Sequence, residues 1–242
     1  SLNEKGISHY IEHMLFKGTE KRTFQKLNDD LEALGGEYNA YTDFSQTVYS
    51  ISCLEDELKS AIEILSDMLI CSKFPEEEIE KERGVILAEI RSSKDSVEDF
   101  SFKKINEVAF KNSSLRYDVA GLDENVKRFN KKELYDYYKK YYIPNNSLIT
   151  MVSSLSHEEA FEEISKSFSN WEANENIKLV VKDEKNRNIK KVTTKENIEL
   201  CTIIYLFTFY DLDKSYELPL RILNHRLGES ANSLLFREVR EN

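Results

Sequence analysis

The sequence predicts an α+β protein in which helices and short β-strands follow one another along the chain. Apolar residues recur at three- and four-residue steps over several long stretches, which is typical of helices with one buried face. Between these stretches lie short runs with a period of two or with several β-branched residues, which favour strands. The 242 residues are 40% hydrophobic, enough for one large core or two smaller ones.

The first predicted elements are two helices and two strands. Residues 3–16 form a helical pattern that ends at Gly18. Thr23 is a residue type that caps helices, and the second helix starts there and ends at Gly35-Gly36. Residues 37–42 and 46–53 are then predicted as two strands, the second with a clear period of two.

Four helices are predicted in the middle of the chain, from about residue 55, after Pro75, over residues 98–110 and over residues 131–142. Proline suits the start of a helix, and the acidic residues 76–78 suit its first turn. Gly84 lies inside the helix that follows Pro75 and costs about 1 kcal/mol relative to Ala. It indicates either close packing at that position or a less regular helix.

The last third of the chain is predicted to contain more strands. Residues 148–152 are predicted as a strand and residues 157–168 as a helix, and the polar residues 170–176 form a candidate linker. Three strand-like runs follow, at 177–181, 189–194 and 198–207, and then a helix that contains Leu218 and Leu227.

This order of strand, acidic turn and Ile/Leu-rich helix echoes the segment that begins near residue 46. We therefore predict two domains, residues 1–172 and residues 173–242, the second being the start of a second copy. Helical pattern begins within a few residues of Ser1 and the chain stops in a charged helical run, so we expect a segment of a longer protein.

Composition narrows the possible partners. Asp and Glu number 44 against 34 Lys and Arg, and the resulting charge of −10 argues against a nucleic-acid-binding protein. That charge suits a site for basic peptides, although an acidic surface that maintains solubility is the simpler explanation. The sequence has no signal peptide and no apolar run near 18 residues, so no membrane partner is expected.

The three cysteines, Cys53, Cys71 and Cys201, are odd in number and never form a Cys-x-x-Cys pair. They are predicted to be ordinary buried or half-buried thiols in a reducing compartment. We therefore expect a cytoplasmic protein of bacterial type, with the matrix of an organelle as the alternative.

One short stretch near the N-terminus carries the strongest chemical pattern. His9, Glu12 and His13 form His-x-x-Glu-His, the inverted order of a common zinc-peptidase motif, and two of the four histidines lie in it. In a helix these side chains project from one side, because residues three and four apart share a face. They suit a zinc ion and the base that activates its water. The alternative is a polar helix face on which two histidines fall by chance.

A catalytic zinc site needs a third protein ligand and an open position for water. Two further histidines are available, His157 and His225, each near the end of a predicted helix among polar neighbours. For both, a capping or surface role is the simpler explanation.

The helix after Pro75 offers better candidates for the third ligand. Glu82 and Glu89 are seven residues apart and share a face with Val85 and Ile86, so that face is predicted to point partly inward. A carboxylate on an inward face needs a partner, and a metal ion is one. A helix rich in solvated Glu–Lys and Glu–Arg pairs explains the same residues equally well.

Several segments together resemble the pitrilysin/insulinase-type zinc peptidases, nearest to the processing-peptidase branch that includes the β subunit of mitochondrial processing peptidase. The first is GISHYIEHMLFKGT at residues 6–19, and the second is LEALGGEYNAYT at residues 31–42. The third runs from Phe74-Pro75-Glu76 to KERGVILAEI at residues 81–90, and the last is SLLFREVRE at residues 233–241. Co-ordered motifs that cover nearly the whole chain are far more specific than one motif.

This resemblance implies a site. His9, His13 and Glu89 would bind Zn²⁺, Glu12 would act as general base, and Glu82 would orient a ligand histidine. Glu89 follows His13 by 76 positions, within the range that the family uses. A structural zinc site is disfavoured, because such sites usually close with four Cys or His ligands.

The resemblance also implies how a peptide binds. Asn39 and Ala40 match an exposed edge strand on which substrate adds as an extra strand. Arg240 matches the arginine of an Arg/Tyr pair that binds substrate, and the matching tyrosine would lie beyond Asn242. Unstructured peptides are therefore the expected substrates.

The implied architecture is a two-layer sheet-and-helix domain that lacks its first strands, followed by the truncated start of a second homologous domain. A second two-domain half, from the same chain or from a homodimer or heterodimer, would close on the first like a clamshell. The implied activity is that of a zinc endopeptidase or oligopeptidase. The alternative is a non-catalytic subunit that binds peptide or assists assembly, and the intact motif favours catalysis.

Overall fold

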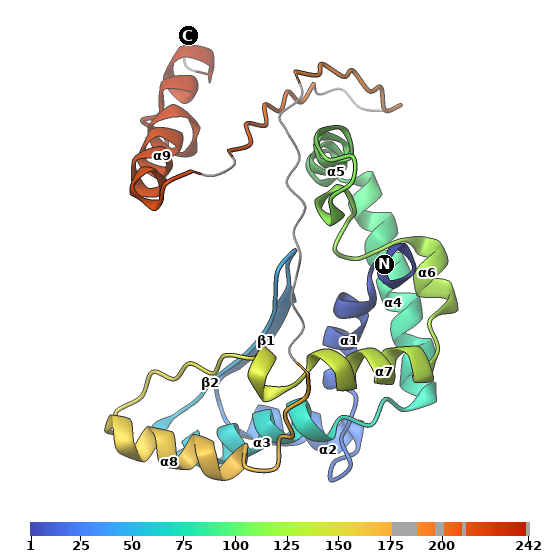
Figure 1. The fold of residues 1–242 in the computed structure, drawn as a ribbon, viewed down its shortest axis with the longest axis vertical. Coiled ribbons are helices and arrows are strands. Elements are labelled where there is room, and N and C mark those ends of the chain that lie inside the picture. The colour runs from blue at the N-terminus through green and yellow to red at the C-terminus, as the bar shows by residue number, and fades with distance from the viewer. Residues whose placement is uncertain (176–187, 197–200, 210–211, 241–242) are drawn as a thin grey trace.

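The computed structural model describes residues 1–175, 188–196, 201–209 and 212–240 (Figure 1). Its longer elements up to the middle of the chain are α1 (Ile7–Leu15), α2 (Phe24–Ala33), β1 (Glu37–Thr42), β2 (Thr47–Ser52), α3 (Leu58–Cys71) and α4 (Glu76–Asp95). They are followed by α5 (Val97–Ala109), α6 (Asp123–Arg128), α7 (Lys131–Tyr141), α8 (His157–Ser167) and α9 (Glu217–Asn224). Single 3₁₀ or π-helical turns lie between or beyond them.

The predicted helices form, with small changes at their ends. The first helix begins at Ile7 and not near residue 3, because Gly6 takes a left-handed conformation (φ 95°) that separates α1 from a 3₁₀ turn at Leu2–Glu4. Thr23 caps α2 as expected, accepting a hydrogen bond from the N–H of Lys26. The α+β class is confirmed in a mostly helical form.

The sheet of the described residues has two strands, fewer than the sequence predicts. β1 and β2 form an antiparallel hairpin in which Glu37 is paired with Ser52 and Thr42 with Thr47. The strands predicted at 148–152 and 189–194 are wrong, and no strand forms in 201–207. Residues 177–181 and 198–200 lie outside the described residues.

The reason for these missing strands is the absence of a partner. Leu148 is 87% exposed and Val152 is fully exposed, so neither packs against a second layer among the described residues. An extended segment becomes a strand only when a neighbour accepts and donates its backbone hydrogen bonds.

Two apolar clusters hold the helices together. The first joins α1, α4, α6 and α7 through buried side chains. These include Ile7, Tyr10, Ile11, Ile86, Ile90, Val126 and Tyr138. The second joins α2 and α3 beneath the hairpin, with Leu27, Leu31, Ile64 and Met68 as its centre. α1 is therefore fixed on one face by the core while its other face stays partly open.

Gly6 and Gly121 are in direct backbone contact, which fixes the start of α1. Both have positive φ, 95° and 94°, and a Cβ atom at residue 121 would lie 2.4 Å from the Cα of Gly6. Gly84 differs, because a Cβ atom there would meet nothing within 4 Å and α4 continues through it as regular helix. Gly84 therefore marks neither close packing nor an irregular helix.

A partly buried ion network joins the loop after α1 to α2 and α3. Arg22 contacts Asp30 at 2.9 Å, Glu63 at 2.5 Å and Asp67 at 2.7 Å. Asp67 also accepts a hydrogen bond from Thr19 at 2.6 Å, and its side chain has no solvent exposure. This network fixes how the second cluster sits beside the end of α1.

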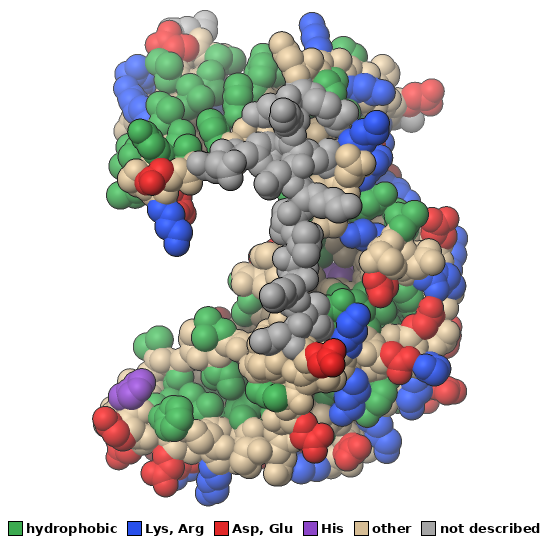
Figure 2. Space-filling view, in the orientation of Figure 1, with side chains coloured by type: hydrophobic (Ala, Val, Ile, Leu, Met, Phe, Trp, Pro, Cys, Tyr) green, Lys and Arg blue, Asp and Glu red, His purple; other side chains and the backbone are tan. Residues whose placement is uncertain are grey.

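The C-terminal elements are apolar on the outside. Hydrophobic side chains gather over α9 and the turns that follow it (Figure 2). Among the exposed ones are Leu218, Ile222, Leu223 and Val239.

Within the described residues, no helix combines the length and apolar character needed to cross a bilayer. Cys53 and Cys71 are partly buried as predicted, whereas Cys201 is exposed, contrary to the prediction.

Candidate metal centre

The candidate ligands of α1 lie opposite its anchored face. Ile7, Tyr10 and Ile11 are buried, and the helical repeat therefore turns His9, Glu12 and His13 toward the partly open side. The sequence pattern thus predicted correctly that these three side chains share one side of a helix.

α4 brings two carboxylates to this side of α1. Glu82 is 6% exposed and lies among buried residues of the helix, whereas the side chain of Glu89 is 46% exposed. Ile86 between them is buried, but Val85 is 44% exposed, so the predicted inward orientation of Val85 is wrong. The inward stripe of α4 runs through Glu82, Ile86 and Ile90, and Glu89 lies at its edge, half exposed.

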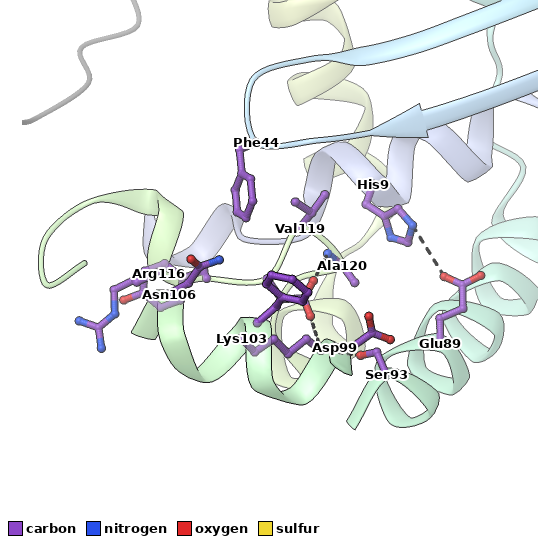
Figure 3. A pocket seen from close by; sticks show the side chains of 13 residues that line it. His9, Phe44, Glu89, Ser93, Asp99, Lys103, Asn106, Arg116, Val119 and Ala120 are labelled. Atoms are coloured by element: carbon purple, nitrogen blue, oxygen red, sulfur yellow. Dashed lines mark hydrogen bonds and ion pairs between the residues drawn. The ribbon is translucent and has the colours of Figure 1, made fainter. Parts of the chain in front are cut away.

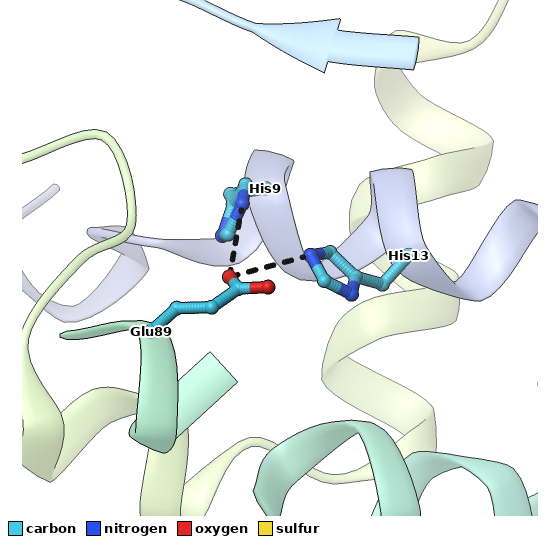
Figure 4. Close-up of side chains that lie close together, drawn as sticks. All are labelled: His9, His13 and Glu89. Atoms are coloured by element: carbon cyan, nitrogen blue, oxygen red, sulfur yellow. Dashed lines mark ion pairs between the residues drawn. The ribbon is translucent and has the colours of Figure 1, made fainter. Parts of the chain in front are cut away.

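His9, His13 and Glu89 converge on one point between the two helices (Figure 4). Glu89 Oε2 lies 3.7 Å from His9 Nε2 and 3.6 Å from His13 Nε2. The two imidazole rings meet nearly edge to face, with centroids 4.7 Å apart. One potential ligand atom from each residue lies within 4.8 Å of the other two. Among the described residues, this is the one group of three or more His, Cys, Asp or Glu that could hold a metal.

Glu82 fixes the orientation of His13. His13 Nδ1 lies 2.9 Å from Glu82 Oε2, and the other carboxylate oxygen is 2.8 Å from Lys17 Nζ. Burial would lower the pKa of His13, but the hydrogen bond to Glu82 and the charges of Glu89 and Glu12 outweigh it and raise this pKa. With Nδ1 bonded to Glu82, Nε2 is the nitrogen that faces Glu89.

His9 has a different environment. Burial, and then the charge of His13, lowers the pKa of His9 and so favours its neutral imidazole. Its Nδ1 is buried without a hydrogen-bond partner among the described residues, while Nε2 faces Glu89. A neutral imidazole with a free nitrogen is the form that binds a metal ion.

Glu12 is held by the hairpin and not by α4. The hydroxyl of Thr42, the last residue of β1, donates to Glu12 Oε2 at 2.5 Å. The sequence pattern predicts neither Thr42 as a partner of Glu12 nor Lys17 as the second partner of Glu82. The available signals were the threonine at the end of the Asn-Ala-x-Thr segment and a lysine four residues after His13.

Two cavities border the candidate centre. The larger has a volume of about 450 Å³, is lined by His9 and Glu89, and extends over α5 with Phe44 on one wall (Figure 3). An ion pair between Lys103 and Asp118 lies in its lining. The smaller has a volume of about 300 Å³ and is lined by Glu12, His13 and residues of β1. Each histidine thus borders one cavity.

The predicted peptide-binding residues fall in two places. Asn39 and Ala40 lie on β1 and line the smaller cavity together with Glu12 and His13. The C-terminal π-helical turn Phe236–Arg240 is drawn well apart from α1 (Figure 1), and the guanidinium of Arg240 stacks on the ring of Phe236 within this turn. The structure brings the first two residues to the site and does not bring Arg240 there.

The other two histidines lie elsewhere, as expected. His157 is the first residue of α8, and the side chain of His225 is 63% exposed in a turn after α9. Neither belongs to the candidate metal group.

The α+β fold and the His-His-Glu cluster define a candidate metalloprotein with the ligand types of a hydrolytic zinc site. The family profile of insulinase (peptidase family M16) matches residues 1–122, and that of the M16 inactive domain matches residues 128–242. The chain therefore belongs to the insulinase/pitrilysin family, M16, and the predicted resemblance is confirmed. The predicted boundary at residues 172/173 stays a prediction.

Relatives with curated names support this assignment. The zinc protease YmxG of Bacillus subtilis (strain 168), described as uncharacterised, is 30% identical over 236 residues, covering 98% of this chain and 57% of the relative. The mitochondrial-processing peptidase subunit beta of Bos taurus is 38% identical over 162 residues, covering 66% of this chain and 33% of the relative. The chain thus spans at most a little over half of these relatives.

Solved structures show the same fold. The first half of the periplasmic protease PqqL from Escherichia coli superposes with a TM-score of 0.68 at 28% identity, covering 75% of this chain and 41% of that one. A protein from Pseudomonas fluorescens, described as an M16 inactive domain, reaches a TM-score of 0.81 at 15% identity, covering 99% and 59%. The second likeness concerns the fold alone.

Proposed function

We propose that this protein is a zinc-dependent endopeptidase or oligopeptidase that hydrolyses extended peptides, with Glu12 as general base. The observation that carries the proposal is the convergence of His9, His13 and Glu89, whose ligand atoms lie within 4.8 Å of one another beside Glu12. The names of the relatives, which are zinc proteases and processing-peptidase subunits, support the same activity.

The three side chains fit a zinc ion. Ligand atoms in a tetrahedral site with bonds of about 2.0–2.2 Å lie roughly 3.3–3.6 Å apart. The separations of 3.7 Å and 3.6 Å from Glu89 to the two imidazoles are close to that value. In His13, Nδ1 is bound to Glu82, so Nε2 is left for the metal. In His9, Nδ1 has no hydrogen-bond partner among the described residues, and Nε2 faces Glu89 and is left for the metal. Three ligands leave a fourth position open, as catalytic sites require.

The chemistry then divides between the metal and the protein. A zinc ion bound here would supply a Lewis acid that polarises a carbonyl oxygen and acidifies water. Glu12 accepts the proton of the attacking water at its carboxylate and later delivers it to the leaving amine. Glu82 holds His13 in one tautomer and one orientation, and Lys17 neutralises Glu82 from the other side.

The hairpin offers a place for an extended peptide. The N–H of Ala40 donates to Asn39 Oδ1 at 2.9 Å, on the edge of β1 that no strand of the described residues covers. A peptide that adds to this edge gains backbone hydrogen bonds that tolerate many sequences. Its side chains would enter the two cavities that border the site.

We further propose that a second two-domain half encloses the substrate and that Arg240 contributes from the C-terminal domain to peptide binding. The basis is the family membership, together with a chain that spans 57% of the length of its bacterial relative. We propose a cytoplasmic location of bacterial type.

The direct test is Glu12→Gln in the full-length protein. We expect peptide turnover to fall by on the order of 10²- to 10⁴-fold, because the proton acceptor is lost, while zinc content stays at the wild-type value. Cleavage of a mixed peptide library and metal analysis measure the two quantities. Glu20→Gln, which removes an exposed carboxylate from the following loop, is the control and should leave both unchanged.

Metal removal completes the test. Wild-type protein treated with a chelator should lose turnover and regain it when zinc is added. Normal turnover by Glu12→Gln would contradict the role of Glu12. A zinc-loaded wild-type protein that binds the library peptides but cleaves none would establish the binding-only alternative.

A further inference from the structure

The hydroxyl groups at the turn end of the hairpin are linked to Glu12. Thr42 ends β1 and Thr47 begins β2, and the two residues are the last pair of the antiparallel register. Thr42 Oγ1 donates to Glu12 Oε2 at 2.5 Å and lies 3.1 Å from Thr47 Oγ1. Within the described part of the chain, Thr42 is the hydrogen-bond partner of the Glu12 side chain.

The direction of these hydrogen bonds follows from their chemistry. An ionised carboxylate only accepts, and a threonine hydroxyl has one proton to donate. The proton of Thr42 therefore points to Glu12, and the bond between the threonines must be donated by Thr47. Two successive donors polarise each other and strengthen the bond to the carboxylate.

The far side of this pair is closed by two partly buried phenols. Tyr49, on β2, and Tyr142, at the end of α7, are hydrogen-bonded to each other at 2.8 Å. Burial raises the pKa of both, and the charge of Glu12 adds to the effect, so both phenols lie within its electrostatic reach. The indole N–H of Trp171 donates to the Tyr142 carbonyl at 3.0 Å and holds this end of α7. The hairpin hydroxyls are thus backed by packed side chains and cannot easily move away from Glu12.

We propose that Thr42 is a positioning residue for the general base: its hydroxyl, oriented by Thr47, holds Oε2 of Glu12 and leaves Oε1 to receive the proton. This inference rests on the proposed function, because it assigns a role to Thr42 only if Glu12 acts as the base. It adds a residue of the sheet to a centre whose candidate metal ligands and base come from α1 and α4.

A purely structural role is the competing explanation. Facing threonines in an antiparallel pair stabilise a hairpin end by themselves. In that case, removal of the hydroxyl would lower stability and would not change the rate of the bound complex. If the hydroxyl positions Glu12, its removal lowers kcat, because the carboxylate is no longer held in the orientation that accepts the proton. KM stays the same, because Glu12 does not contribute to substrate binding.

The test compares Thr42→Val with Thr42→Ser in the full-length, zinc-loaded protein. Valine keeps the shape and removes the hydroxyl, and we expect kcat to fall on the order of tenfold to hundredfold, as for a lost hydrogen bond to a charged group. KM and zinc content should stay near the wild-type values, because the backbone edge and the metal ligands are untouched. Serine keeps the hydroxyl and should restore most of kcat.

Two further variants keep the test sharp. Thr47→Val should lower kcat by less than Thr42→Val, because Thr42 keeps its proton but loses the group that orients it. Ser52→Ala removes an exposed hydroxyl from the other end of β2 and should leave kcat unchanged. If Thr42→Val fails to fold, a normal kcat for Thr47→Val overturns the proposal, and a reduced kcat with unchanged KM supports it.

The outcomes separate this inference from the proposed function. An inactive Glu12→Gln together with an unchanged kcat for Thr42→Val overturns the positioning role alone. An equal loss of kcat in the valine and serine variants also overturns it, because the hydroxyl would then not be the cause. An active Glu12→Gln overturns the proposed function itself.

Discussion

Glu82 and Glu89 show how two identical side chains on one helix receive different tasks. Glu82 is buried and shared between the ring of His13 and the ammonium group of Lys17, so its charge is already balanced. Glu89 is half exposed and faces two imidazole nitrogens at 3.6–3.7 Å. Glu89 is therefore placed to bind the metal, and Glu82 to orient one of the histidines.

This difference predicts the order of two substitutions in metal binding. Glu82→Gln should weaken zinc affinity about 10- to 100-fold, the usual effect of losing a group that orients a ligand. Glu89→Gln should weaken it by at least roughly another tenfold, because a direct charged ligand is lost. Competition with a zinc chelator in the full-length protein measures both affinities. Glu76→Gln, in the exposed first turn of α4, is the control, and equal affinities for Glu82→Gln and Glu89→Gln would contradict the assignment.

At this scale the sequence predicted the residues that carry a pattern and missed those that do not. A helical repeat predicts that His9, Glu12 and His13 share one side of a helix, and a spacing of two turns puts Glu82 and Glu89 on one face. The spacing left a face of solvated ion pairs equally open, and the roles of the two carboxylates came from the family resemblance. Thr42 and Lys17 carry only weak local signals, and their contacts with Glu12 and Glu82 depend on how β1 and α4 pack against α1. Arg240 matches a motif, yet the turn Phe236–Arg240 that contains it lies apart from α1 (Figure 1).

Among the elements, the start of α1 is fixed by a backbone contact as well as by the core. Gly6 caps the helix, and the loop at Gly121 passes so close that neither residue has room for a side chain. The same loop continues from Ala120, which lines the larger cavity together with His9. The contact thus fixes both the start of the motif helix and a wall of that cavity.

Two glycine substitutions should therefore act in opposite directions. Gly121→Ala combines a positive φ with a clash against backbone atoms and should destabilise the protein by about 3 kcal/mol or more. Gly84→Ala meets open space in a regular helix and should stabilise it by about 0.5–1 kcal/mol. Urea unfolding of both variants checks the signs. A neutral Gly121→Ala would show that the close contact is not maintained in solution.

Helices were predicted well and strands poorly, for a physical reason. The hydrogen bonds of a helix are internal, so α2 and α4 can be read from capping residues and spacing alone. A strand depends on a distant partner, and only the hairpin pair has one close by in the chain. Residues 148–152 have strand-forming side chains, but among the described residues no neighbour pairs with them.

For the whole molecule, the Arg22 network predicts how stability responds to acid. Hydrogen bonds from Lys26 and Arg22 lower the pKa of Asp30, and Arg22 lowers that of Glu63 despite the opposing effect of its partial burial. A carboxyl group with a lowered pKa stabilises the fold above its unfolded pKa and loses this effect as pH falls through the folded value. We therefore expect the free energy of unfolding to fall as pH drops below about 4.5.

Arg22→Met isolates this contribution. At pH 7 the substitution should lower the free energy of unfolding by roughly 2–4 kcal/mol, because it leaves the fully buried Asp67 without its cation. The loss of the pair with Glu63 adds little, because solvent screens this half-exposed carboxylate. The difference from wild type should narrow as pH falls toward 3, because the carboxyl groups of Asp30 and Glu63 are protonated in the unfolded state there and their ion pairs with Arg22 stabilise the fold less. Lys26→Met, whose side chain is 62% exposed, should change stability by less than about 0.5 kcal/mol. Urea unfolding from pH 7 to pH 3 measures this, and a constant difference across that range would contradict the prediction.

The register of the hairpin also sets which changes in chain length the protein can tolerate. Side chains alternate along a strand, so a one-residue insertion in Glu37–Thr42 would turn Thr42 away from Glu12 and put a neighbour in its place. Residues 43–46 lie beyond the last pair and carry Phe44, which lines the larger cavity. Loops of different length there can reshape that cavity without moving Glu12. Residues can therefore be gained or lost at positions 43–46, which would change the side chains that the larger cavity accepts from a bound peptide. The paired strands Glu37–Thr42 and Thr47–Ser52 must keep their length.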